Sequence, residues 1–125
     1  MNDQTLAGAP VLVVGAGIMG AGIAQVAAQA GHPVMLFDAR EGVAVEAKAR
    51  LGASLQALVA KGRLAPDAVQ TALGRIQPIA RLEEAAGVRV VVEAIIEQLA
   101  AKRALFQQLE GIVAADCLLA TNTSS

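Results

Sequence analysis

Three glycines in one short segment have the spacing that phosphate binding requires. The pattern GxGxxG is formed by Gly15-Ala16-Gly17-Ile18-Met19-Gly20. In such a loop the first glycine permits a tight turn, the second lets the backbone approach a diphosphate, and the third allows a helix to pack closely on a strand. The free N–H groups at the start of that helix attract anions. Between a strand and a helix the loop predicts a dinucleotide site; elsewhere it would be only a packing turn.

Asp38 stands 18 positions after Gly20, at the end of the next apolar run, and is the expected ligand of an adenosine ribose. A carboxylate at this position accepts hydrogen bonds from the ribose hydroxyls and repels a 2′-phosphate, so it favours NAD over NADP. Arg40 follows two residues later, and a cation there weakens the exclusion of NADP. The alternative interpretation of Asp38 is a solvated residue at a strand end.

Hydrophobic periodicity predicts the elements that must position these residues. After the glycine loop, apolar residues recur at intervals of 4, 3 and 4, the helical period: Met19, Ile23, Val26 and Ala30. Gly31 follows where a helix commonly ends. A helix over 40–62 has one apolar face, formed by Ala44, Ala47, Leu51, Leu55 and Leu58. Further helices are predicted over 66–73 and 99–114, and strands over 10–15, 33–38, 75–80, 88–94 and 117–121.

This alternation of strands and helices predicts an α/β fold: a Rossmann-like doubly wound, mostly parallel sheet with helices on both faces. A length of 125 residues suits one hydrophobic core, so 1–125 is expected to be a single dinucleotide-binding domain. Pro78 cannot donate a hydrogen bond to a neighbouring strand, which predicts that its strand lies near an edge.

Composition argues against several classes of function. A net charge of -1 provides no basic surface for nucleic acid. The uncharged stretch from Gln4 to Phe37 contains Pro10, Pro33 and six glycines, so no apolar helix of about 20 residues survives there. The lone Cys117 and the lack of a basic N-terminal signal favour a reducing, cytoplasmic location. We expect no metal site, no membrane span and no nucleic-acid partner.

Polar residues follow two strands in the second half of the chain. Glu93 and Glu97 flank the end of the strand over 88–94, and Asn122 and Ser124 follow the last predicted strand. Because ligands of open parallel sheets bind beyond the carboxyl ends of the strands, both segments are expected to face the cofactor crevice. Alternatively, they are polar connections in which Asn122 or a serine caps a helix.

Three segments together resemble the N-terminal NAD-binding domain of the L-3-hydroxyacyl-CoA dehydrogenases: GAGIMGAGIAQVAAQAGHPVMLFD, VVVEAIIEQLAAKRALFQQLE and LLATNTSS. The resemblance runs from about residue 11 to the last residue, and 3-hydroxybutyryl-CoA and 3-hydroxyadipyl-CoA dehydrogenases are equally similar. It implies oxidation of (3S)-3-hydroxyacyl-CoA to 3-ketoacyl-CoA with NAD as the hydride acceptor. It also implies that Asp38 binds the adenosine ribose and that the dinucleotide loop consists of Gly15, Gly17, Ile18, Met19 and Gly20.

The resemblance implies further roles in the second half. Glu97 and Lys102 match positions at the nicotinamide end of the cofactor site. Asn122 matches a residue near the nicotinamide and the substrate. Ser124 matches the serine whose hydroxyl bonds the 3-oxygen of the substrate. Asn122 and Ser124 are therefore the expected catalytic residues.

The resemblance also implies contacts with coenzyme A and a catalytic histidine that this sequence does not contain. Ser54 and Lys61 fall where the family's helical hairpin contacts coenzyme A, and a cation suits its phosphates. In the family the chain continues to a histidine that takes the 3-hydroxyl proton and to a helical C-terminal domain that forms a homodimer. The only histidine here is His32, expected to be structural, so the chain looks truncated within the enzyme. We expect these 125 residues to bind NAD without turnover.

Two other interpretations stay open at this point. The β-hydroxyacid dehydrogenase group shares a GxGxMG start and a GH turn, although it lacks a terminal NTSS and typically has an Asn-Arg pair in place of Asp38. A non-catalytic dinucleotide-sensing module would need no chemistry from Ser124 or Glu97. A histidine about 20 residues beyond the serine would favour catalysis.

Overall fold

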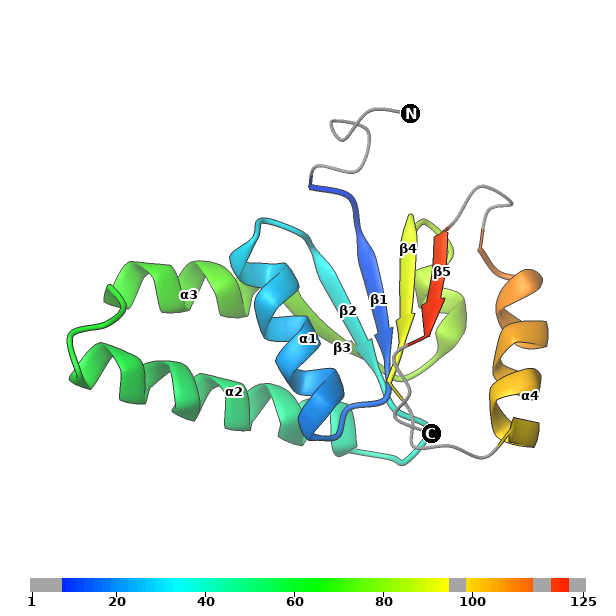
Figure 1. The fold of residues 1–125 in the computed structure, drawn as a ribbon, viewed down its shortest axis with the longest axis horizontal. Coiled ribbons are helices and arrows are strands. Elements are labelled where there is room, and N and C mark those ends of the chain that lie inside the picture. Colours follow the sequence, from blue (N-terminus) through cyan, green and yellow to red (C-terminus); the bar gives the residue numbers. More distant parts are fainter. Residues whose placement is uncertain (1–7, 95–98, 114–117, 122–125) are drawn as a thin grey trace.

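Five parallel strands form one sheet in the order β3-β2-β1-β4-β5 (Figure 1). The computed structural model describes residues 8–94, 99–113 and 118–121. The strands are β1 (Val11–Val14), β2 (Val34–Phe37), β3 (Ile76–Ile79), β4 (Val90–Glu93) and β5 (Leu118–Thr121). Neighbouring strands are parallel throughout, and β3, which contains Pro78, lies at an edge. The predicted α/β class is confirmed.

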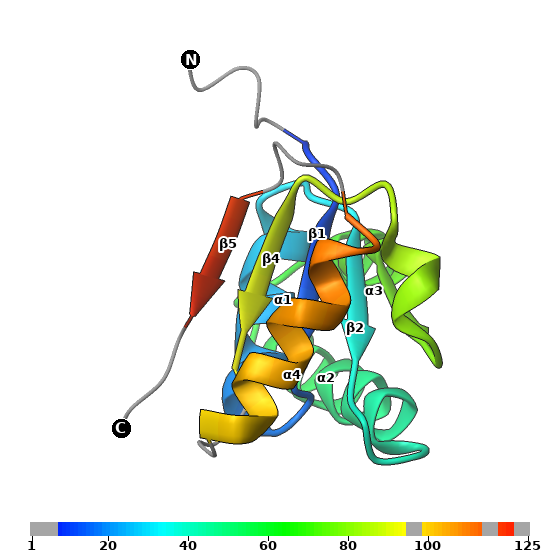
Figure 2. The ribbon, with the colours of Figure 1, turned by 90° about the vertical axis from the view of Figure 1, so that its right-hand side faces the viewer.

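Helices cover both faces of this sheet, as Figure 2 shows for α4 and α1. One face carries α1 (Ile18–Gln29), α2 (Val43–Ala60) and α3 (Pro66–Arg75). The other carries the short 3-10 helix η2 (Leu82–Ala85) and α4 (Leu99–Glu110). Successive side chains of a strand point to opposite faces, and a hydrophobic core lies on each face of the sheet. Val13 of β1 lies in the first core, beneath α1, α2 and α3. Leu12 lies in the second core, beneath η2 and α4. The two cores therefore hold the sheet between two helical layers.

Helix α1 is buried mainly through its smallest residues, and from the stripe that predicted it Ile23 alone packs against the core. Its buried residues are Gly20, Ala21, Ala24 and Ala28. Val26 is 68% exposed and Met19 is 46% exposed. Small residues let the helix approach the sheet closely, although they contribute little to a hydrophobic pattern. The 3.6-residue period therefore identified the helix correctly but did not identify its packed face.

The end of α1 is fixed by a glycine and a histidine. Gly31 has a φ of 103°, which side-chain-bearing residues rarely adopt, and it follows the helix as predicted. The His32 N–H donates to the carbonyl of Ala27 at 3.0 Å. The His32 ring donates from Nδ1 to the carbonyl of Ala9 at 2.8 Å, which ties this turn to the residues before β1. This bond supports the structural role expected for His32.

The packed face predicted for the helix over 40–62 is confirmed. On α2 the buried residues are Ala44, Ala47, Leu51 and Leu55, with Leu58 packed against the same core. On α4, Leu105 and Leu109 are buried in the second core. None of the helices in the described parts of the chain is long and apolar enough to cross a bilayer.

Replacement of Gly20 tests the close packing of α1. A Cβ atom at this position would lie 1.6 Å from the carbonyl oxygen of Gly15, so the helix would have to shift. We expect Gly20→Ala to lower the free energy of unfolding by about 1–3 kcal/mol or more, measured by urea denaturation.

Gly22→Ala is the matched control because it lies in the same helix and a Cβ there meets no atom within 4 Å. Removal of a glycine from a helix interior stabilises by about 0.5–1 kcal/mol, so this variant should be at least as stable as the parent chain. Equal losses in the two variants would contradict the packing role of Gly20.

Candidate dinucleotide-binding site

The turn after β1 joins the carboxyl ends of two neighbouring strands. Gly15 has a φ of 103°, in the left-handed region that favours glycine. Its N–H donates to the carbonyl of Phe37 at the end of β2, at 2.7 Å. The strand order reverses between β1 and β4, and open parallel sheets bind ligands beyond the carboxyl ends of the strands at such a point. The glycine turn therefore lies where a ligand is expected.

Packing within the chain does not explain why position 17 of the loop is a glycine. It is the N-cap of α1 with an extended backbone, and a Cβ there would meet no atom within 4 Å. Within the described residues, no side chain caps this end of the helix. The first N–H groups of a helix lack partners within it and carry partial positive charge. The open space beside Gly17 thus fits a diphosphate, which would accept hydrogen bonds from these groups.

Asp38 is held directly beside this loop. The Ala16 N–H donates to Asp38 Oδ2 at 2.8 Å, across the gap between β1 and β2. The Arg40 N–H donates to Oδ1 at 2.9 Å, while the Arg40 guanidinium donates from Nε to Oδ1 and from Nη2 to Oδ2, both at 2.9 Å. The carboxylate side chain is 6% exposed. Asp38, the residue predicted to bind a ribose, therefore adjoins the glycine loop, as binding of a dinucleotide would require.

The same contacts keep Asp38 ionised. The hydrogen bond from the Arg40 side chain is the largest influence and lowers the pKa of Asp38; burial raises it, and the Ala16 N–H lowers it again. The result is a pKa of about 2, below the ordinary value of 3.8. At neutral pH the group is an acceptor only, which suits ribose hydroxyls.

Strands β4 and β5 end in register at the same edge, where Glu93 pairs with Thr121. Glu93 is fully buried at the end of β4, an interior strand of the sheet, and the following Ala94 N–H donates to the carbonyl of Val14 at 2.8 Å. The sequence pattern indicated a polar residue at a strand end but not its burial. Glu93 is therefore an interior residue at the carboxyl end of β4 and not part of the protein surface.

The remaining predicted site residues stay predictions. Glu97, Asn122 and Ser124 lie outside the described residues, and Lys102 belongs to α4 without a described side chain. Ser54 lies on α2 and Lys61 directly follows it, and both are exposed.

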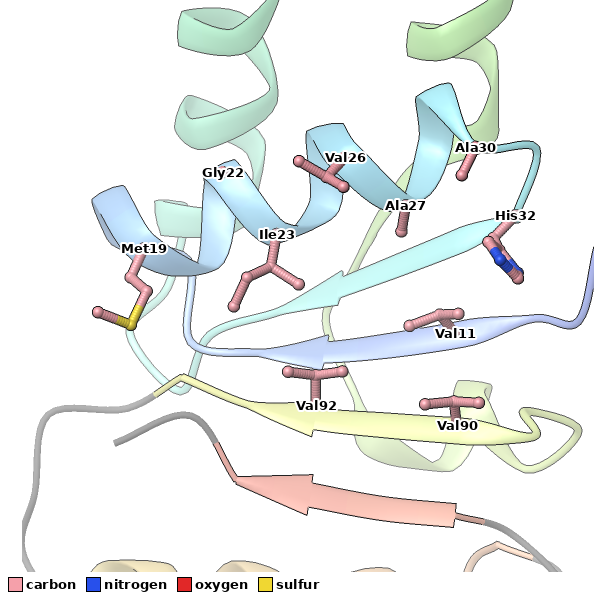
Figure 3. Close-up of a pocket in the computed structure, with 10 residues that line it drawn as sticks. All are labelled: Val11, Met19, Gly22, Ile23, Val26, Ala27, Ala30, His32, Val90 and Val92. Carbon is pink, nitrogen blue, oxygen red and sulfur yellow. The ribbon is translucent and has the colours of Figure 1, made fainter. Parts of the chain in front are cut away.

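An apolar groove of about 900 Å³ lies between α1 and the strands β1 and β4 (Figure 3). Its lining is Val11, Met19, Gly22, Ile23, Val26, Ala27, Ala30, His32, Val90 and Val92. With His32 as the one titratable residue in this lining, the groove suits apolar surface and not a diphosphate. Across the described residues, no group of three or more His, Cys, Asp or Glu side chains is placed to hold a metal ion.

Sequence reasoning missed two donors at this site. The Ala16 N–H bonds Asp38, but backbone donors have no side-chain signal that a sequence pattern could reveal. The bidentate contact of Arg40 was also missed, although its position two residues after Asp38 had indicated an influence on the cofactor phosphate. A charged pair separated by one residue at a strand end is the signal that could have indicated this contact.

The fold and the glycine loop beside an ionised strand-end aspartate define a class: the dinucleotide-binding domains of Rossmann type. A family model described as "3-hydroxyacyl-CoA dehydrogenase, NAD binding domain" matches residues 10–125. The chain belongs to this family, whose domain binds NAD. This membership decides in favour of the predicted dehydrogenase family over the β-hydroxyacid dehydrogenase group.

Individual relatives agree with this membership. The chain is 39% identical over 125 residues to a 3-hydroxyadipyl-CoA dehydrogenase of Escherichia coli, covering 100% of this chain and 25% of the relative. It is 46% identical over 113 residues to a probable 3-hydroxybutyryl-CoA dehydrogenase of Deinococcus radiodurans, covering 90% and 40%. The crystal structure of a 3-hydroxybutyryl-CoA dehydrogenase from Escherichia coli superposes with a TM-score of 0.90 at 39% identity, covering 94% and 25%. The chain thus spans well under half the length of these relatives.

The low pKa of Asp38 predicts how its contribution to stability changes with pH. A carboxyl whose pKa falls from 3.8 to about 2 on folding stabilises the folded state fully above about pH 5 and loses that contribution as the pH falls toward 2. Asp38→Asn does not titrate. We therefore expect the difference in unfolding free energy between the parent chain and this variant to shrink over that window, measured by urea denaturation at a series of pH values. A difference that stays constant would contradict the ionised, hydrogen-bonded Asp38.

Proposed function

We propose that the turn after β1 and the end of β2 together bind NAD. The diphosphate accepts hydrogen bonds from the N-terminus of α1 beside Gly17, and Asp38 accepts them from the adenosine ribose. The observation that carries this assignment is the 2.8 Å hydrogen bond from the Ala16 N–H to Asp38. This bond holds the residue proposed to bind the ribose against the glycine loop. Ile18, which is 92% exposed at the start of α1, offers apolar surface to the cofactor.

The proposal extends to the reaction of a longer chain built like the relatives. There, (3S)-3-hydroxyacyl-CoA is oxidised to 3-ketoacyl-CoA, and NAD, when bound, supplies the hydride acceptor. Ser124 donates a hydrogen bond to the 3-oxygen, and Asn122 lies beside the substrate and the nicotinamide. Glu97 and Lys102 line the nicotinamide end. The common edge at which β4 and β5 end supports these roles, because the chain leaves both strands at the expected crevice.

Further contacts of the longer protein are proposed on the same basis. The exposed Ser54 and Lys61 contact coenzyme A, whose phosphates suit the Lys61 ammonium. A C-terminal domain, for which the greater length of the relatives leaves room, forms a homodimer.

Gly17→Ala separates the ligand role of this glycine from any role in folding. An added Cβ meets no atom of the described chain, so we expect the midpoint of thermal unfolding to change little. The methyl group would occupy the space in which a diphosphate approaches the helix, weakening at least one charge-assisted hydrogen bond. The dissociation constant for NAD should rise about tenfold or more, measured by calorimetry. Unchanged NAD affinity would place the diphosphate elsewhere.

The 125-residue chain should bind NAD without oxidising substrate. Its single histidine, His32, donates from Nδ1 to the carbonyl of Ala9 at the opposite end of β1 from the glycine turn, so it is not placed to take a proton at the crevice. We expect no NADH absorbance when the chain is mixed with NAD and (3S)-3-hydroxybutyryl-CoA, while calorimetry on the same sample detects NAD binding. Sustained NADH formation would show that the chain contains its own base.

A further inference from the structure

The hydrogen-bonding capacity of the Asp38 carboxylate is filled in this structure. Oδ2 accepts from the Ala16 N–H and from Arg40 Nη2, and Oδ1 accepts from the Arg40 N–H and from Arg40 Nε. A carboxylate has about four lone-pair positions, and these contacts use all of them. Ribose hydroxyls can bind Asp38 only if some of these donors leave.

The donors differ in how easily they can leave. The N–H of Ala16 belongs to a fully buried residue in the turn after β1, and the N–H of Arg40 is fixed by the chain two residues beyond Asp38. The Arg40 side chain, in contrast, is 71% exposed. Exposed ion pairs contribute little to stability, so the guanidinium is the donor that a ligand can displace.

We propose that Arg40 sets the discrimination between NAD and NADP, an inference that rests on the dinucleotide site proposed above. With NAD, the guanidinium competes with the ribose hydroxyls for Asp38. With NADP, it turns to the 2′-phosphate, for which its planar set of donors is well suited. The two backbone N–H groups stay on Asp38 and partly offset its charge beside that phosphate. The chain therefore accepts NADP more readily than Asp38 alone would allow.

Removal of the guanidinium should change the two affinities in opposite directions. In Arg40→Ala the competitor is gone, and NAD should bind about two- to fivefold more tightly. The cation for the 2′-phosphate is also gone, and NADP should bind about tenfold more weakly. The ratio of the two dissociation constants, measured by calorimetry at fixed ionic strength, should thus shift by about twentyfold or more.

Arg63→Ala is the matched control, because this substitution removes the same formal charge as Arg40→Ala. Arg63 is exposed in the connection between α2 and α3. Both of its dissociation constants should match those of the parent chain. NAD binding by Arg40→Ala also reports that this variant is folded.

The outcomes separate this inference from the proposed function. If the parent chain does not bind NAD, the dinucleotide site itself is wrong and the inference falls with it. If the parent chain binds NAD but Arg40→Ala leaves the ratio unchanged, or loses both cofactors, the role of Arg40 is refuted while the site stands. An equal shift in Arg63→Ala also refutes it, because the effect would then reflect net charge alone.

Discussion

The close contact between Gly20 and the carbonyl group of Gly15 determines how β1, the turn after it and α1 fit together. Only a residue without a Cβ fits over the turn after β1, because an added Cβ would lie 1.6 Å from that oxygen. This contact sets the start of α1 at the carboxyl edge of the sheet, with open space beside the Cα of Gly17. The left-handed turn at Gly15 bonds the end of β2, and the next N–H, that of Ala16, reaches Asp38. One steric requirement thus fixes the start of α1, the space proposed for the diphosphate and Asp38 relative to each other.

The electrostatics of the site follow from this geometry. Backbone donors at the start of α1 provide the positive end for a diphosphate, and there is no acidic side chain in the first turn of the helix to oppose it. Asp38 stays ionised at a pKa of about 2 because Arg40 and two backbone N–H groups surround it. The carboxylate is therefore accessible to a ligand only through exchange with the Arg40 side chain. The ion pair of Arg40 with Asp38, which keeps the carboxylate ionised, is therefore also the contact with which a ligand of Asp38 must compete.

Hydrophobic periodicity predicted the order of strands and helices, because apolar runs of period 2 and 3.6 are set by burial in a layered fold. It misjudged the packed face of α1, because the glycine and alanines that pack there carry weaker hydrophobic signals than Val26 and Met19, which are exposed. Asp38 could be placed because strand ends and glycine spacing fix its position. The bond from Ala16 and the burial of Glu93 could not be predicted, since both depend on the strand order around β1 and β4.

Amide chemical shifts of the isotopically labelled chain, recorded during titration with NAD, would show where the cofactor binds. If the diphosphate binds at the start of α1 and the ribose at Asp38, the amide signals of Ala16, Gly17 and Arg40 should move together and saturate. Signals from the far end of the α2–α3 connection, such as Arg63, should stay in place. Shifts confined to the apolar groove beside α1, or no shifts at saturating NAD, would contradict this placement of the cofactor.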